Sequence, residues 1–328
     1  MSARDAGLDR VRGAAIVLVV AGHVWRGLAG DGLLANTPAF RAIDAAVYLF
    51  HMPVFFLLAG LFFAPPRAPR PFLARWAARL VWPFLLWSWI EGAAHAAWGA
   101  PMGAWGILGY PWPPKSVFWF LAALAFIQVL VWAARRLPPQ AAAALLVGLS
   151  AAMVAGIVPD PGLGMLWLGL VHLPWFAAGY LIGAERVPRL TGRPALALPG
   201  AVLFAAGQAL AFTAGLAAAP LFYLATGLAT AGFVLAVANL PARLPALERL
   251  GPLTMPIYVS HVIFAAAVRV ALQIAGVTSV PVHLVAGVAA GIAGPLLLWS
   301  VAHRLGLAAA LGLGGAGRAR MAQAGAAS

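Results

Sequence analysis

Long apolar runs alternate with short segments rich in Arg, Pro and Gly along the chain. A helix needs about 20 mostly apolar residues to cross the hydrocarbon core of a membrane. Runs of this length predict ten transmembrane helices, at residues 12–28, 42–63, 72–98, 116–134, 140–157, 163–183, 195–216, 219–240, 252–275 and 281–304. We therefore expect an all-α, polytopic membrane bundle over residues 1–305, followed by a Gly- and Ala-rich disordered cytoplasmic tail at 306–328.

The basic residues predict how this bundle is oriented. Short cytoplasmic loops of membrane proteins are enriched in Lys and Arg. If the N-terminus is inside, seventeen of the 21 Lys and Arg residues fall on the cytoplasmic side. Arg26, Arg41 and Lys115 fall on the outer side, and Arg269 lies within a span. This alternation predicts that both termini are cytoplasmic.

Composition excludes several other classes of protein. With 63% hydrophobic and 9% charged residues, the chain lies far outside the soluble average. Its net charge of +13 comes from cations in short loops, so we expect membrane lipids and not nucleic acid as partners. The absence of cysteine excludes disulfides, thiolate metal sites and cysteine nucleophiles. A signal peptide is the alternative for the first run, but that run contains Arg12 and His23 and lacks a small-residue cleavage site.

Two histidines lie deep within the predicted spans. At about 1.5 Å of rise per residue, His23 lies roughly 16 Å from Arg12, which marks the cytoplasmic end of its span. His51 lies roughly 13 Å from the outer end of the next span, which runs in the opposite direction. The two imidazoles therefore have similar depth, and we expect them to share a site. An imidazole near neutral pH suits a general base that takes a proton from an alcohol.

The other histidines of the spans have a simpler interpretation. His172 falls at a similar depth on the sixth span, and His261 is predicted to lie nearer the cytoplasm. A buried imidazole usually makes an interhelical hydrogen bond. We expect that role for His95, His261 and His283. No predicted helix carries two histidines four residues apart, so we predict no metal site.

Charged residues near the span ends are further candidates. Arg75 and Arg79 are four residues apart and so share one helix face, where two guanidinium groups can clamp phosphates or contact anionic lipid headgroups. Asp44 and Glu91 lie toward the outside, as does Arg269. Either the two carboxylates pair with Arg269, or they bind a polar acceptor from the outside.

Several ordered blocks resemble integral membrane acyltransferase family 3. The hallmark of that family is an Arg and a His separated by ten residues on the first helix, which Arg12 and His23 match. The block at residues 50–60, together with the Gly-His pair at 22–23, leans toward the sugar O-acetyltransferase branch related to fucose O-acetylases, although Ala59 stands where many members carry Ser. The matching blocks are residues 8–13, 21–23, 50–60, 75–79 with Pro83, 118–121, 173–180 and 256–261.

The resemblance implies a membrane enzyme that moves an acyl group, usually acetyl from acetyl-CoA, to a hydroxyl of a carbohydrate or glycolipid. His23 would be the general base or a transient acyl carrier, with His51 as a supporting hydrogen-bonding group. Arg12 belongs to the same catalytic motif, but its position suits the donor or structural support better than proton transfer. Arg75 and Arg79 would hold the CoA phosphates. Acyl-CoA would be a substrate, and no permanently bound cofactor is expected.

The acceptor side is the least specific part of this interpretation. Glu91, Asp44 and Trp119 are the candidate acceptor-binding residues. Aromatic residues of the loop at 99–115 can stack on a sugar, or they can form an interfacial aromatic belt. We expect a multi-pass protein of the plasma membrane that modifies cell-envelope carbohydrate. The alternatives are a transporter or flippase that uses buried His and Arg as a relay, and a structural or lipid-sensing membrane protein.

Overall fold

In the computed structural model, residues 5–214 and 219–313 are described, and every regular element among them is a helix. The all-α prediction is therefore confirmed. Hydrocarbon offers no water to backbone N–H and C=O groups, and a helix satisfies these groups within one segment. The chain divides into two compact units, which we call unit 1 (Met1–Val11 and Tyr48–Arg243) and unit 2 (Arg12–Val47 and Leu244–Ser328).

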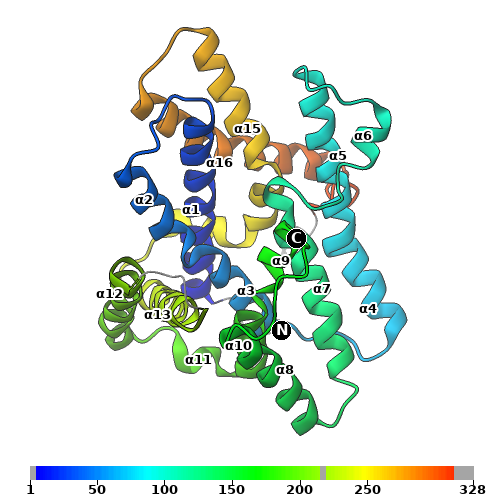
Figure 1. The fold of residues 1–328 in the computed structure, drawn as a ribbon, viewed down its shortest axis with the longest axis vertical. Coiled ribbons are helices and arrows are strands. Elements are labelled where there is room, and N and C mark those ends of the chain that lie inside the picture. Colours follow the sequence, from blue (N-terminus) through cyan, green and yellow to red (C-terminus); the bar gives the residue numbers. More distant parts are fainter. Residues whose placement is uncertain (1–4, 215–218, 314–328) are drawn as a thin grey trace, which may run out of the picture. The chain divides into compact units, whose positions relative to one another are not determined.

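Unit 1 contains most of the helices (Figure 1). Its longer elements are α3 (His51–Leu61), α4 (Pro69–Trp76), the π-helix η1 (Ala77–Val81), α5 (Trp82–Ala97), α7 (Trp119–Ala134), α8 (Pro139–Val154), α10 (Leu173–Ile182), α12 (Ala197–Ala214) and α13 (Ala219–Ala238). Its shorter elements are α6 (Ala104–Leu108), η2 (Ser116–Phe118), α9 (Met165–Leu170), η3 (Ala184–Arg186), α11 (Val187–Leu190) and η4 (Pro194–Leu196).

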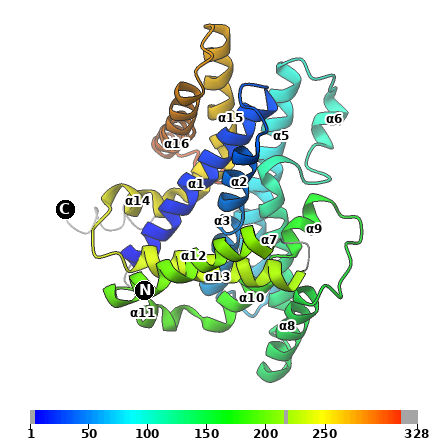
Figure 2. The same ribbon diagram turned by 60° about the vertical axis from the view of Figure 1, so that its left-hand side comes forward.

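Unit 2 contains the part of α1 (Ala6–Gly30) that begins at Arg12. Its other elements are α2 (Pro38–Tyr48), α14 (Pro245–Leu250), η5 (Gly251–Leu253), α15 (Thr254–Ile274) and α16 (Val280–Arg304). Figures 1 and 2 both show α15 and α16 as neighbours, joined by a short loop. The predicted tail begins at 306. Residues 306–313 form hydrogen-bonded turns, and 314–328 lie outside the described residues.

Eight stretches of the described residues are long and apolar enough to cross a membrane. They are Ala6–Gly30, Pro38–Leu61, Ser116–Ala134, Met165–Ile182, Pro194–Thr213, Ala219–Ala238, Pro245–Ile274 and Val280–Arg304. The other two predicted spans are also helical. Residues 140–157 correspond to the 16-residue helix α8, and residues 72–98 correspond to α4, η1 and α5 in succession. The polytopic fold is therefore confirmed, whereas the count of ten and the cytoplasmic termini stay predictions.

Glycines allow close helix contacts within unit 1. A Cβ added at Gly207 or Gly232 would overlap the backbone of the facing helix in the α12–α13 pair. The same is true of Gly60 and Gly179 between α3 and α10. Lipid tails are as apolar as the helix surfaces, so association depends on close packing and small residues supply it.

One arginine connects the start of the chain to this helix pair. Arg10 donates hydrogen bonds to the carbonyls of Ala238, Leu240 and Ala242, at 3.2, 2.7 and 2.7 Å. The last carbonyls of a helix have no partner within the helix, and a cation is favoured there by the helix dipole. Arg10 is therefore a structural residue that caps the C-terminal end of α13.

Glycines also allow close helix contacts within unit 2. A Cβ at Gly287 of α16 would lie 2.9 Å from a methyl group of Val24, and a Cβ at Gly291 would lie 2.6 Å from a methyl group of Val20. Both valines are on α1, on either side of His23. These glycines let α1 approach α16 closely and thereby fix the position of His23 within unit 2.

We predict that Gly232→Leu lowers the unfolding temperature of the detergent-purified protein, because overpacking a close contact costs about 1–3 kcal/mol. The matched control is Gly148→Ala on α8, where an added Cβ meets no heavy atom within 4 Å. The control should unfold at or slightly above the wild-type temperature, because Ala favours a helix over Gly. Retention on size exclusion after heating gives the measurement. Equal unfolding temperatures for wild type and Gly232→Leu would contradict the close α12–α13 contact.

Candidate functional site

His23 of α1 lies beside a second imidazole in unit 2. The ring centroids of His23 and His261 are 5.2 Å apart, with an angle of 57° between the ring planes. His23 is half-buried, and His261 has 0% exposure. Arg12 is also half-buried and lies on the same helix, eleven residues before His23. The predicted Arg–His pair is thus on one continuous helix, and the structure adds His261 to it.

The hydrogen bonds of His261 fix how its ring is protonated. Its Nδ1 lies 3.0 Å from the carbonyl oxygen of Ile257 and 2.8 Å from that of Tyr258. A carbonyl only accepts, so Nδ1 donates and carries the hydrogen. Nε2 is buried and has no hydrogen-bond partner among the described residues. Both hydrogen bonds of Nδ1 thus go to the preceding turn of its own helix, and the predicted interhelical hydrogen bond is not formed by this nitrogen.

Two ion pairs organise the part of unit 2 predicted to lie outside. Arg26 binds both carboxylate oxygens of Asp44, at 2.6 and 2.7 Å. Arg269 pairs with Asp31 at 2.7 Å, and its guanidinium group lies against Gly27 near the end of α1. Of the two alternatives for Asp44, the pairing with Arg269 is therefore not the one formed, because Asp44 binds Arg26 and Arg269 binds Asp31. A bidentate partner on Asp44 favours a structural role for this carboxylate.

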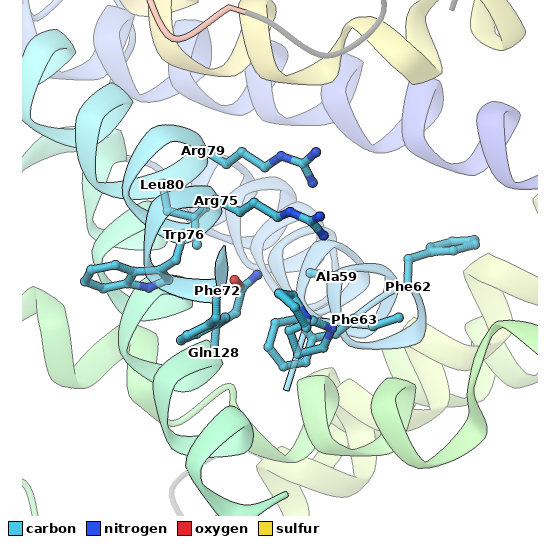
Figure 3. A pocket seen from close by; sticks show the side chains of 12 residues that line it. Ala59, Phe62, Phe63, Phe72, Arg75, Trp76, Arg79, Leu80 and Gln128 are labelled. Atoms are coloured by element: carbon cyan, nitrogen blue, oxygen red, sulfur yellow. The ribbon is translucent and has the colours of Figure 1, made fainter. Parts of the chain in front are cut away.

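Arg75 and Arg79 line one cavity in unit 1. The cavity has a volume of about 260 Å³, and its wall includes Phe63, Trp76 and Gln128. Figure 3 shows both arginine side chains on one side of the helix and the Trp76 indole on the other. The indole nitrogen of Trp76 donates to the Ala125 carbonyl at 3.0 Å and so anchors this helix to α7.

A larger cavity adjoins this one. It has a volume of about 720 Å³ and shares Phe62, Phe63 and Ala64 with the first. Arg67 and Arg135 add further positive charge to its wall. Small-molecule sites usually measure about 300–1,000 Å³, so the larger cavity has the size of such a site. Four arginines against one carboxylate, that of Glu185, leave the walls of the two cavities net positive.

Proline explains why the helix between α4 and α5 changes its winding. Pro83 has no backbone N–H, so it cannot donate to the carbonyl of Arg79. The Trp82 N–H bonds instead to the carbonyl of Ala77, five residues back, as in a π-helix. Such turns are frequent at functional sites. Here the turn carries Arg79, with Arg75 just before it.

His51 belongs to a second cluster, within unit 1. It is buried at the start of α3, and its ring lies edge-on to Tyr48 at 4.6 Å. His172, just before α10, stacks on Phe56 at 4.8 Å and also lies 5.7 Å from Trp119. An electrostatic interaction links His172 with His51. The structure therefore brings His51, His172 and Trp119 together.

Glu91 lies in a polar cluster beside the second half of α5. The Ser116 hydroxyl donates to its carboxylate, and the other carboxylate oxygen, Oε2, is buried and has no hydrogen-bond partner among the described residues. Ser116 has a φ of 50°, which is strained for a residue other than Gly and is typical of functional positions. The Lys115 ammonium lies over the ring of Tyr110, at 4.8 Å. Burial, and then the charge of Glu91, raise the pKa of Tyr110 to about 12.

The predicted site residues are thus divided between the units. His23, Arg12 and Asp44 belong to unit 2. The remainder belong to unit 1 and are His51, Arg75, Arg79, Glu91 and Trp119. Among the described residues, no group of three or more His, Cys, Asp or Glu side chains is arranged to hold a metal ion.

A family model described as an acyltransferase domain matches residues 5–300. The match covers both units and most of the chain. The chain belongs to acyltransferase family 3. It is therefore an enzyme that transfers acyl groups, and with its apolar helices it is a multi-pass membrane protein. No curated protein and no solved structure matches the chain.

His261 is the residue of interest that sequence reasoning undervalued. Its depth estimate placed it nearer the cytoplasm than His23, so the two were not expected to meet. A rise per residue gives depth along one helix but not the register between two helices. The sequence signal for this segment is the family-like block at residues 256–261, which contains Pro256 and Ser260. That signal does not identify the neighbour of His261, which only the packing shows.

Alkaline pH should destabilise the protein partly through Tyr110. The pKa of its phenol is about 12 in the folded state and has the ordinary value of 10.0 in an unfolded chain. Between these values the unfolded state binds fewer protons, so stability falls as pH rises. The unfolding temperature of wild type should therefore fall more steeply from pH 10 to 12 than that of Tyr110→Phe, with parallel curves at lower pH. Parallel curves throughout would contradict this.

Proposed function

We propose that this acyltransferase moves an acyl group, most simply acetyl, from acyl-CoA to a hydroxyl of a carbohydrate or glycolipid at the plasma membrane. The observation that carries this proposal is the cavity lined by Arg75 and Arg79. A guanidinium group is always charged and presents a fork of donors that matches phosphate oxygens. CoA is the acyl carrier that brings several phosphates, so its nucleotide end suits this cavity and the adjoining one.

The acyl-transfer chemistry is assigned to His23. As a general base, its ring accepts the proton of the acceptor hydroxyl while the oxygen forms a bond to the acyl carbon. The carbon–sulfur bond then breaks, and the CoA thiolate takes up the proton. As an acyl carrier, the ring would itself bond to the acyl carbon as the carbon–sulfur bond breaks, and the thiolate would take the N–H proton of the ring. The nitrogen–carbon bond would then break as the hydroxyl oxygen bonds to the acyl carbon, and the hydroxyl proton would return to the ring. Labelled acyl retained on the protein would distinguish the second route from the first.

His51 and Arg12 have supporting roles in this proposal. The buried ring of His51 lies edge-on to Tyr48, which suits a group that orders its surroundings. Arg12 is three turns from His23 along α1 and therefore suits contact with the donor or structural support better than proton transfer.

On the acceptor side, Glu91 is the strongest candidate. Its buried Oε2 has no partner among the described residues, and a sugar hydroxyl can donate to such an oxygen. Trp119 offers a ring for stacking, although it already packs against Phe56 and His172. Asp44 is held by Arg26 and contributes mainly through that pair. Nothing in the fold or the comparisons supports the transporter alternative.

Replacing His23 tests the proposed chemistry. His23→Ala should lower acetyl transfer from labelled acetyl-CoA by at least about 100-fold, because general acid–base catalysis contributes about 10²–10⁴. The control is His303→Ala, a histidine of α16 whose ring stacks on Trp299, and it should retain activity. Size exclusion of both variants establishes that they are folded. Wild-type turnover by His23→Ala would refute the assignment of this residue.

Arg75→Ala and Arg79→Ala should each raise KM for acetyl-CoA by about 10- to 100-fold, the equivalent of one charge-assisted hydrogen bond. Arg70→Ala is the matched control, since Arg70 is exposed on the same helix and does not line the cavity. With acetyl-pantetheine, which has no phosphates, the variants and wild type should have equal KM values. The same defect with both donors would show that the arginines act otherwise than on phosphate.

A further inference from the structure

The His261 side chain has one ring nitrogen, Nε2, that can accept a hydrogen bond. Its Nδ1 hydrogen is used by two backbone carbonyls of its own helix, so the lone pair of the neutral ring is on Nε2. The ring has no exposed surface, and Nε2 has no hydrogen-bond partner among the described residues. Buried polar atoms are nearly always hydrogen-bonded, so this nitrogen calls for a donor in the working enzyme.

Within unit 2, the ring of His23 lies close to the ring of His261. Its centroid lies 5.2 Å from that of His261, which allows a hydrogen bond directly or through one water after a small rotation of a ring. The close contacts of Gly287 with Val24 and of Gly291 with Val20 hold α1 on both sides of His23. A Cβ added at Gly291 would also lie 3.6 Å from the carbonyl oxygen of His261, so α16 packs closely against both helices that carry the two rings.

We propose that His261 is a positioning residue, which accepts a hydrogen bond from one ring nitrogen of His23 and thereby directs the other nitrogen toward the reacting hydroxyl. This inference rests on the proposed function of His23. It goes beyond the interpretation of His261 as a core histidine, because a purely structural role uses only Nδ1. Fixing the tautomer of a catalytic imidazole through its second nitrogen is a general way to orient it.

The proton balance of the step is simple. The acceptor O–H bond breaks as the new carbon–oxygen bond forms, and the proton goes to the ring nitrogen of His23 that faces the hydroxyl. The positive charge on His23 is stabilised by its hydrogen bond to Nε2 of His261. When the carbon–sulfur bond breaks, the thiolate takes the proton from His23. His261 keeps its Nδ1 hydrogen throughout and gains no proton.

Two substitutions separate the two nitrogens of His261. Asn places an amide nitrogen near the position of Nδ1, so His261→Asn keeps the bonds to the carbonyls and loses the acceptor. Gln reaches further, so His261→Gln can present an oxygen near the position of Nε2. We expect His261→Asn to lower kcat by about 10- to 100-fold with KM for acetyl-CoA unchanged, and His261→Gln to retain more activity. A purely structural role predicts the opposite order, and that result would overturn the proposal.

A double substitution tests whether His261 acts through His23. In a His23→Ala background, His261→Asn should cause no further loss of residual activity, because the two side chains form one unit. A loss equal to that seen in the wild-type background would mean that His261 acts independently, and would also overturn the proposal.

Nitrogen NMR of the full-length protein with ¹⁵N-labelled histidine gives a readout that does not depend on turnover. The chain has seven histidines, so His261→Asn assigns the signal by its loss. We expect neutral His261 protonated at Nδ1, with an Nε2 signal that shifts in His23→Ala. Protonation at Nε2, or no shift, would overturn the proposal. If wild type transfers no acyl group from acyl-CoA, the proposed function fails, and the NMR result still decides whether the two rings are hydrogen-bonded.

Discussion

Hydrocarbon contains no water, so each polar group at membrane depth must find its partner within the protein. Most of the structure follows from this constraint. It requires helices for the backbone, and it explains why Arg10 binds three carbonyls at the end of α13. It also explains the pairs Arg26–Asp44 and Arg269–Asp31. Groups that depart from the rule then stand out, and Nε2 of His261 and Oε2 of Glu91 are two such atoms.

Close packing is the second consequence of the hydrocarbon environment. Lipid tails do not drive helices together as water does, so the helices associate through close contacts. Pairs such as α3–α10 and α12–α13 meet through glycine, and so do α1 and α16. These contacts are rigid because backbone lies against backbone, or against a short branched side chain. In unit 2 the rigid contact flanks His23, so the packing that holds the helices also holds the ring. Catalysis needs such positioning, since a loosely held base loses much of its effect.

The sequence predicted where the helices lie along the chain better than it predicted which residues meet between helices. Apolar run length located every long helix, since the length needed to cross a membrane is a strong constraint. The π-helix was not predicted, although Pro83, which causes it, was visible. The spacing of Arg75 and Arg79 correctly indicated one shared face. Asp31 was not identified as the partner of Arg269, and His261 was undervalued, because register between helices depends on side-chain packing that no periodicity encodes.

The cost of removing a charged group from water explains why arginine and histidine have different positions along the helices. A guanidinium group keeps its charge at all accessible pH values, so it is costly at depth and is best placed near a span end, where phosphates can reach it. An imidazole can be neutral, so a pair such as His23 and His261 needs no counter-ion until a proton arrives. When that proton arrives, a second imidazole stabilises it without the permanent charge that a carboxylate would bring into hydrocarbon. A membrane acyltransferase therefore has the lowest free-energy cost of buried charge when its histidines lie at membrane depth and its arginines lie at the ends of the spans.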